Sequence, residues 1–242
     1  MNLYCLRKFK LRSFLKTHLV QRHLTMATTT TKLQRFKEAM QLVYGPFEGL
    51  TQADAEKWAP PDKPGAGGHR GRYLWTDAFG VVNFITLYRE TESALYLALA
   101  KGVVRTVHDV LGRMRDGKAR LPGATDEHPL GGGLRIGKVD AAGSDGDGQY
   151  HHYLTLWMFA LNRLALAAED KAYNAQAIEL AKAVHPHFVM RKSSGRLGMV
   201  WKVSMDLKTV LVPSEGHREC ILGPNISLGA AGQGTKSSSL NA

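Results

Sequence analysis

The feature that most constrains this chain is a repeated pattern of helical periodicity between residues 75 and 190. Apolar residues recur at the spacing of an α-helix in four stretches: about 75–90, 93–111, 149–168 and 171–190. Short connections at 91–92 and 169–170 join these stretches in pairs, and a long loop over about 112–148 separates the pairs. Because short connections favour antiparallel neighbours, the sequence predicts two antiparallel α-hairpins.

The two predicted hairpins are related by an offset of 77 residues. The shared residues are Leu87, Tyr96, Ala100 and His108, which recur as Leu164, Tyr173, Ala177 and His185. The match spans the bend and continues down the second helix of each hairpin. Repeated hairpins of this kind bury their apolar faces against each other. We therefore expect the first helices of the two hairpins to lie side by side and parallel.

Shorter helices are predicted before the repeat. Leu33, Phe36, Met40 and Val43 have helical spacing over 32–43, and Thr51 is a candidate N-cap for a short helix that ends near Trp58. Prolines follow that helix and stop it. No strong alternating run that would build a sheet is present. The predicted fold class is all-α, with a body over 32–216.

The two ends of the chain differ from the body in composition. Residues 1–31 carry six basic side chains and no acid, and Leu11, Phe14, Leu15 and Leu19 share one helical face. A basic amphipathic leader is typical of a mitochondrial presequence. Two alternatives stay open: translation that starts at Met26, which gives a cytoplasmic protein, and an error in the gene model. Residues 217–242 form a Gly/Ser-rich tail that we expect to be disordered.

Charge and cysteine content exclude several classes of protein. The net charge is +11, but without the six basic residues of the leader it falls to +5, so a nucleic-acid partner loses its main support. Cys5 and Cys220 cannot build a disulfide framework or a CxxC metal site, and no transmembrane run is present. The sequence predicts a cytoplasmic protein, or a mitochondrial one if residues 1–25 are a presequence. It does not predict an oligomeric state.

Several segments of the repeat resemble a known superfamily. The segment Arg72–Gly80, the motif Leu87-Tyr-Arg-Glu-Thr and the pair Tyr96-Leu97 resemble the first inner-to-outer hairpin of (α/α)6 toroids. The stretches 153–168 and 173–182 resemble the next hairpin. This superfamily comprises the six-hairpin glycosidases, unsaturated glucuronyl hydrolases and N-acylglucosamine 2-epimerases. The resemblance covers about 72–215 and implies that the chain holds two hairpins and the beginning of a third, about half of a complete ring.

The resemblance implies that the site lies where the inner helices start and the loops between hairpins close over them. A sugar site needs carboxylates for proton transfer, aromatic rings for stacking, and polar side chains for the hydroxyl groups. The candidate catalytic residues at this end are Asp77, Asp126, Glu127 and Asp147. The candidate substrate-binding residues are Trp75, His128, Gln149, Tyr150, His151, His152, Trp201 and Lys202.

Each of these candidates also has a structural interpretation. Asp77 lies near the first turn of its helix, where a negative charge interacts favourably with the helix dipole. Asp147 is placed to cap the next helix. Trp75 has the apolar ring of a core residue. His151 and His152 are neighbours and point about 100° apart on a helix, so we expect one to be packed and the other to face the site. We predict no metal and no cofactor, because neither a complete calcium loop nor a nucleotide-binding loop is present.

Three functions remain open on this basis. The first is a glycoside hydrolase-like enzyme, in which two carboxyl groups act on a sugar. The second is a sugar epimerase or isomerase on the same fold, in which histidines act as acid and base. The third is a non-catalytic fragment or pseudoenzyme. In each case the expected partner is a carbohydrate or another small molecule.

Overall fold

The computed structural model describes residues 31–143, 145–191 and 195–213. Their helices are a first helix over 31–44, α2 (Gln52–Lys57), the 3-10 turn η1 (His69–Gly71), α3 (Leu74–Thr91), α4 (Leu95–Leu111), α5 (His151–Ala167) and α6 (Lys171–Phe188). The strands are β1 (Gln149–Tyr150), β2 (Val189–Arg191), β3 (Leu197–Met199), β4 (Lys202–Val203) and β5 (Val210–Val212). The predicted leader, apart from Thr31, and the predicted tail lie outside the described residues. None of the described helices is long and apolar enough to cross a membrane.

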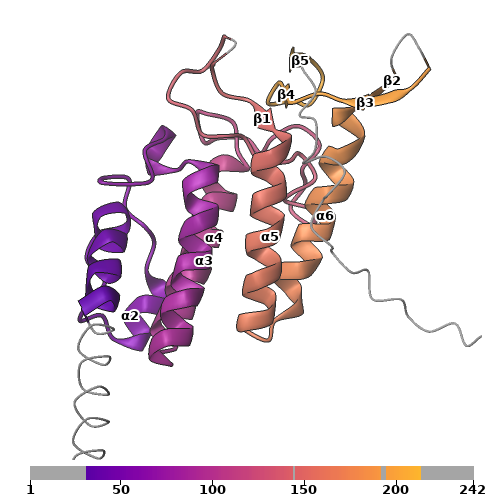
Figure 1. Cartoon of the computed structure of the whole chain (residues 1–242). Coiled ribbons are helices and arrows are strands. Elements are labelled where there is room, and N and C mark those ends of the chain that lie inside the picture. Colours follow the sequence, from indigo (N-terminus) through magenta and orange to yellow (C-terminus); the bar gives the residue numbers. More distant parts are fainter. Residues whose placement is uncertain (1–30, 144, 192–194, 214–242) are drawn as a thin grey trace, which may run out of the picture.

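The two predicted hairpins are confirmed. Helices α3 and α4 form one hairpin, and α5 and α6 form the other. Each bend contains one residue with a left-handed backbone conformation, Glu92 in the first and Glu169 in the second. Helices α3 and α5 pack directly on each other (Figure 1). Their starts lie together, because Trp75 contacts His152 and Tyr153. The inner helices are therefore parallel, as the repeat predicted.

The prediction of a purely helical chain is wrong in part. About half of the described residues are helical, and two small antiparallel sheets accompany the hairpins, one with the strand order β1-β4-β5 and one formed by β2 and β3. Each strand has two or three residues, which is too short for an alternating pattern to show in the sequence. Both sheets lie with the long loop at the end of the hairpins where α5 starts (Figure 1). That end is where the candidate site was predicted.

One hydrophobic core joins all the described helices except η1. It includes Met40 and Tyr44 from the first helix, together with buried side chains of both hairpins and Val203 of β4. The first helix lies tight against α3, because a β-carbon at Gly80 would overlap the ring and hydroxyl of Tyr44. Helix α2 begins at a capping box in which Thr51 and Asp54 satisfy each other's backbone N–H groups, as the sequence indicated for Thr51. This packing gives the inner-helix starts a rigid support.

Candidate ligand-binding surface

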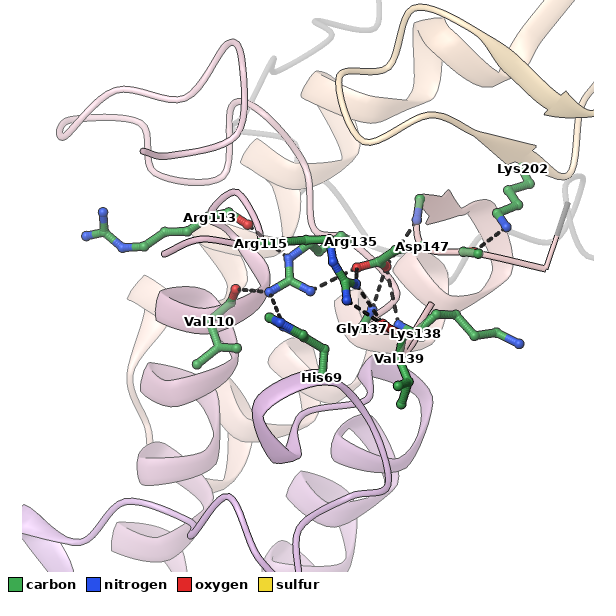
Figure 2. Close-up of polar contacts among 12 residues, drawn as sticks. His69, Val110, Arg113, Arg115, Arg135, Gly137, Lys138, Val139, Asp147 and Lys202 are labelled. Carbon is green, nitrogen blue, oxygen red and sulfur yellow. Dashed lines mark hydrogen bonds and ion pairs between the residues drawn. The ribbon is translucent and has the colours of Figure 1, made fainter. Parts of the chain in front are cut away.

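The carboxylate of Asp147 is the centre of a buried ion cluster in the long loop. It accepts hydrogen bonds from Arg115 (2.8 Å) and Arg135 (2.9 Å) and from the backbone N–H of Gly137 (2.9 Å) (Figure 2). The Arg135 guanidinium also donates to the carbonyls of Val110 and Arg113. Asp147 does not cap α5, whose N-cap residue is Tyr150. Its carboxylate instead fixes the path of the loop against the end of α4.

His69 completes the cluster from the Gly-rich turn before α3. The Arg135 guanidinium lies 3.1 Å from Nδ1 of His69 (Figure 2). Desolvation and the charges of Arg135 and Arg115 lower the pKa of His69. Because the arginine N–H donates to it, the imidazole serves here as a neutral acceptor. The turn over 65–71 is thus held against the long loop.

Asp77 is also buried and paired. Its carboxylate accepts from Arg72 at 3.0 Å, from the backbone N–H of Tyr73 and from the Tyr44 hydroxyl. Both Asp77 and Arg72 are 0% exposed. Burial raises the pKa of Asp77 to about 6, against the opposing effect of the Arg72 charge. Desolvation, and not repulsion from another carboxylate, is therefore the cause of the raised pKa of Asp77.

Asp126, Glu127 and His128 lie on an exposed turn that extends toward the outer helix α6. Asp126 pairs with Arg120 at 3.0 Å, and His128 Nδ1 lies 4.0 Å from the carboxylate of Glu179 in α6. The backbone N–H of Leu130 donates to the same carboxylate. Hydrogen bonds from its own backbone and from Thr125 lower the pKa of Glu127. None of the contacts of this turn joins it to Asp77 or Asp147 within the described residues, so the structure does not gather the four candidate acids in one hollow.

The aromatic candidates do come together at the inner-helix starts. Trp75 of α3 contacts His152 (5.7 Å between ring centroids) and Tyr153 (5.0 Å) of α5, and His152 contacts Trp201 at 5.4 Å. We call the rings of Tyr73, Trp75, Tyr150, His152, Tyr153 and Trp201 the aromatic surface. Trp75 and Trp201 are each 37% exposed. Part of each indole ring is therefore open to a ligand.

Two tyrosine hydroxyls and one imidazole supply hydrogen-bonding groups to this surface. The hydroxyls of Tyr73 and Tyr153 lie 2.8 Å apart, and the Trp201 indole N–H donates to Nδ1 of His152 at 2.6 Å. Burial and the bond to Tyr73 raise the pKa of Tyr153, so its phenol remains protonated at neutral pH. The surface thus presents hydrogen-bonding groups next to exposed ring faces.

Charged groups border the aromatic surface beside Tyr150. Lys138 pairs with Asp145 at 2.8 Å, and the charges of both act on the Tyr150 phenol. The Lys202 ammonium lies 5.3 Å from the Tyr150 ring centre and donates to the carbonyl of Gly146. Lys202 is 0% exposed, and burial lowers its pKa. It packs beneath the surface and supports the ring of Tyr150.

The two histidines at the start of α5 separate as expected, one packed and one partly exposed. His151 is buried against Phe188 (5.2 Å) and lies near His185, and burial lowers its pKa to about 4. His152 is partly exposed among the aromatic rings. Gln149 is buried too: its amide binds the backbone of Gly132, Leu134 and Met205. Of the candidate binding residues, Gln149, His151 and Lys202 therefore lie in the interior.

Sequence reasoning missed several residues of this region. Tyr73 and Tyr153 were not among the candidates, although Tyr73 precedes Trp75 by two residues and Tyr153 directly follows His152. The 77-residue offset relates Tyr73 to the candidate Tyr150 and could have indicated it. Arg115 and Arg135 were missed because nothing in a loop sequence shows which arginine will be buried beside a distant carboxylate. Across the described residues, no group of three or more His, Cys, Asp or Glu side chains could hold a metal ion.

No family model, no curated protein and no solved structure matches the chain. Its function is therefore inferred from its own geometry.

Proposed function

We propose that this chain is a carbohydrate-binding protein whose ligand stacks on the aromatic surface. The observation that carries the proposal is the pair of partly exposed indoles, Trp75 and Trp201, each in contact with the His152 ring. Sugar rings offer C–H faces to aromatic rings and hydroxyl groups to polar atoms at their edges. The Tyr73 and Tyr153 hydroxyls and the His152 imidazole are suited to the second role.

The geometry supports binding more than hydrolysis. Glycoside hydrolysis requires two carboxyl groups on either side of the bond, ~5 Å apart in retaining enzymes and ~6–10 Å apart in inverting ones. Asp77 and Asp147 are held in the interior by arginines, and Asp126 and Glu127 lie on the turn near α6. Asp145 borders the aromatic surface, but it forms an ion pair with Lys138. Of the three functions considered from the sequence, the non-catalytic one therefore has the best support.

The (α/α)6 toroid belongs to the same proposal. Two parallel inner helices, each followed by an antiparallel outer helix, are what an arc of such a ring would contain. The position of the aromatic surface, at the inner-helix starts, is where the resemblance placed a sugar site. Both facts support the assignment of the chain to that architecture.

Binding can be tested on a glycan array, followed by calorimetry with the oligosaccharide that binds best. Trp75→Ala and Trp201→Ala should each weaken binding about 10- to 100-fold, since a buried aromatic anchor contributes ~1–3 kcal/mol. Leu42→Ala is the control, because Leu42 is 76% exposed on the first helix and does not belong to the aromatic surface. Equal losses in all three variants, or no glycan bound by the wild type, would refute the proposal.

A further inference from the structure

The outward faces of α3 and α5, below the aromatic surface, carry exposed apolar side chains. Phe79 is 45% exposed on α3, and Phe159 and Leu166 are 39% and 60% exposed on α5. Val82 and Leu156 are partly exposed nearby on the same two helices. Phe79 and Val82 are three residues apart, and Phe159 and Leu166 are seven residues apart. Each pair therefore lies on one stripe of its helix. We call these five residues the inner-helix face.

The inner-helix face has almost no charge. Between His152 and Ala167, the α5 sequence has one charged side chain, Arg163, whose guanidinium lies 5.3 Å from the Phe159 ring centre. On α3 the exposed positions between Trp75 and Thr86 are uncharged. The outer helices differ: the exposed positions of α4 include Arg105 and Asp109, and those of α6 include Lys171 and Lys182. When the exposed helix residues on one side of a domain are apolar and uncharged while those on the other side are charged, the uncharged side is typically covered by a partner.

We infer that the inner-helix face binds a second copy of this chain and forms a two-fold dimer. The inference is independent of carbohydrate binding. The exposed fractions of Phe79, Phe159 and Leu166 correspond to ~300 Å² of apolar surface if each fully exposed side chain presents ~200 Å². A standard interface buries ~800 Å² per partner, of which ~60% is apolar. With the partly exposed Val82 and Leu156, the inner-helix face approaches the apolar area of such an interface, and Trp75 stays outside it.

The arrangement of the face also suits self-association. Because Trp75 lies beside His152 and the two helices are parallel, residues 77 apart lie at about the same height, so Val82 lies level with Phe159. This level is the middle of the face. A two-fold axis through it, perpendicular to the helices, would bring Arg163 of one copy to the height of Phe79 and Thr155 of the other. The two Arg163 side chains would then lie on opposite sides of the axis, and no like charges would meet.

The test is sedimentation equilibrium of the full chain over a concentration series. The wild type should have twice the mass of the chain at the upper concentrations. Phe159→Glu and Leu166→Glu should each have the mass of one chain, because every dimer would have to bury two added carboxylates, whose desolvation is costly even beside Arg163. Leu42→Glu is the matched control: Leu42 is 76% exposed on the first helix and does not belong to the inner-helix face, and this variant should remain dimeric.

Far-ultraviolet circular dichroism on the same samples shows whether each variant is folded, and Leu166→Glu, in the last turn of α5, is the variant least able to disturb the core. A wild type that is monomeric at every concentration would overturn the inference. So would folded glutamate variants that stay dimeric, since the interface would then lie elsewhere. A monomeric wild type that is destabilised by Phe159→Glu would indicate instead that the ends of the chain cover the face.

Discussion

Charged residues of the long loop form buried ion pairs that their positions in the sequence do not reveal. Asp147 was predicted as a catalytic acid because it stands in an acidic, Gly-rich segment before a helix. In the structure, Arg135 is 0% exposed and needs a counter-charge that Asp147 supplies. Which arginine lies beside which carboxylate depends on how a loop of more than thirty residues folds back. That information is non-local, and no spacing rule captures it.

Replacing Asp147 should therefore reduce stability strongly. In Asp147→Asn, Arg135 and the largely buried Arg115 would lose their anionic partner, and the free energy of unfolding should fall by about 3–5 kcal/mol. Asp145→Asn is the matched control two residues away, because its exposed side chain pairs only with Lys138 at the surface, and it should change stability little. Urea unfolding measures both. A similar, small change in the two variants would show that the buried cluster does not hold the loop.

At the scale of elements, periodicity predicted the helices and failed for the strands. The four helices of the repeat begin and end within about two residues of their predicted bounds, because each buries an apolar stripe over four or five turns. β1 and β4 pair across more than fifty residues with two residues each, and their pairing brings Trp201 beside His152. The aromatic surface could be predicted in part, since Trp75, Tyr150 and His152 lie at the starts of the two inner helices. Trp201 was expected at the beginning of a third hairpin, but the described chain forms the short strands β3, β4 and β5 there, so that expectation is wrong. The burial of Gln149, His151 and Lys202 could not be predicted, because it depends on the small sheet.

The contact between the two hairpins should make stability depend on pH. The indole N–H of Trp157 in α5 donates to Nε2 of His108 in α4 at 3.0 Å, so the imidazole must be neutral there, and burial lowers its pKa to about 4. Between about pH 6.5 and 4 the unfolded chain binds a proton at His108 that the folded chain does not. The free energy of unfolding should thus fall as the pH is lowered through this window, by about 3 kcal/mol from this residue.

The comparison that isolates this effect is wild type against His108→Gln, whose amide oxygen can still accept from Trp157. Urea unfolding at several pH values between 7 and 4.5 should give a shallower fall for the variant. His151, which also has its pKa lowered to about 4, contributes to the fall in both proteins. Parallel curves for the two proteins would mean that His108 titrates alike in the folded and unfolded chains.

At the scale of the molecule, the long loop joins the two hairpins into one unit. The backbone N–H of Leu74, at the start of α3, donates to Ile136, and the N–H of Ile136 donates to Gly148. Leu134, two residues earlier, donates to the side chain of Gln149, next to α5. Together with the direct packing of α3 on α5 and the shared core, these bonds leave neither hairpin with a core of its own. We therefore expect the described part of the chain to unfold in one cooperative transition.

Tryptophan fluorescence can report each half separately. Trp58 packs against the first hairpin and Trp157 is buried in the second, so two variants that each keep one of these indoles, with the other three tryptophans replaced by Phe, would report on one half each. Within each variant, the urea midpoint measured by fluorescence should coincide with the urea midpoint measured by far-ultraviolet circular dichroism. If the hairpins were independent repeat units, stability would be a sum of separate terms and the Trp58 and Trp157 signals would change at different urea concentrations. Two separated midpoints within either variant, one by fluorescence and one by circular dichroism, would therefore contradict a single cooperative unit and would imply that the loop only tethers the hairpins.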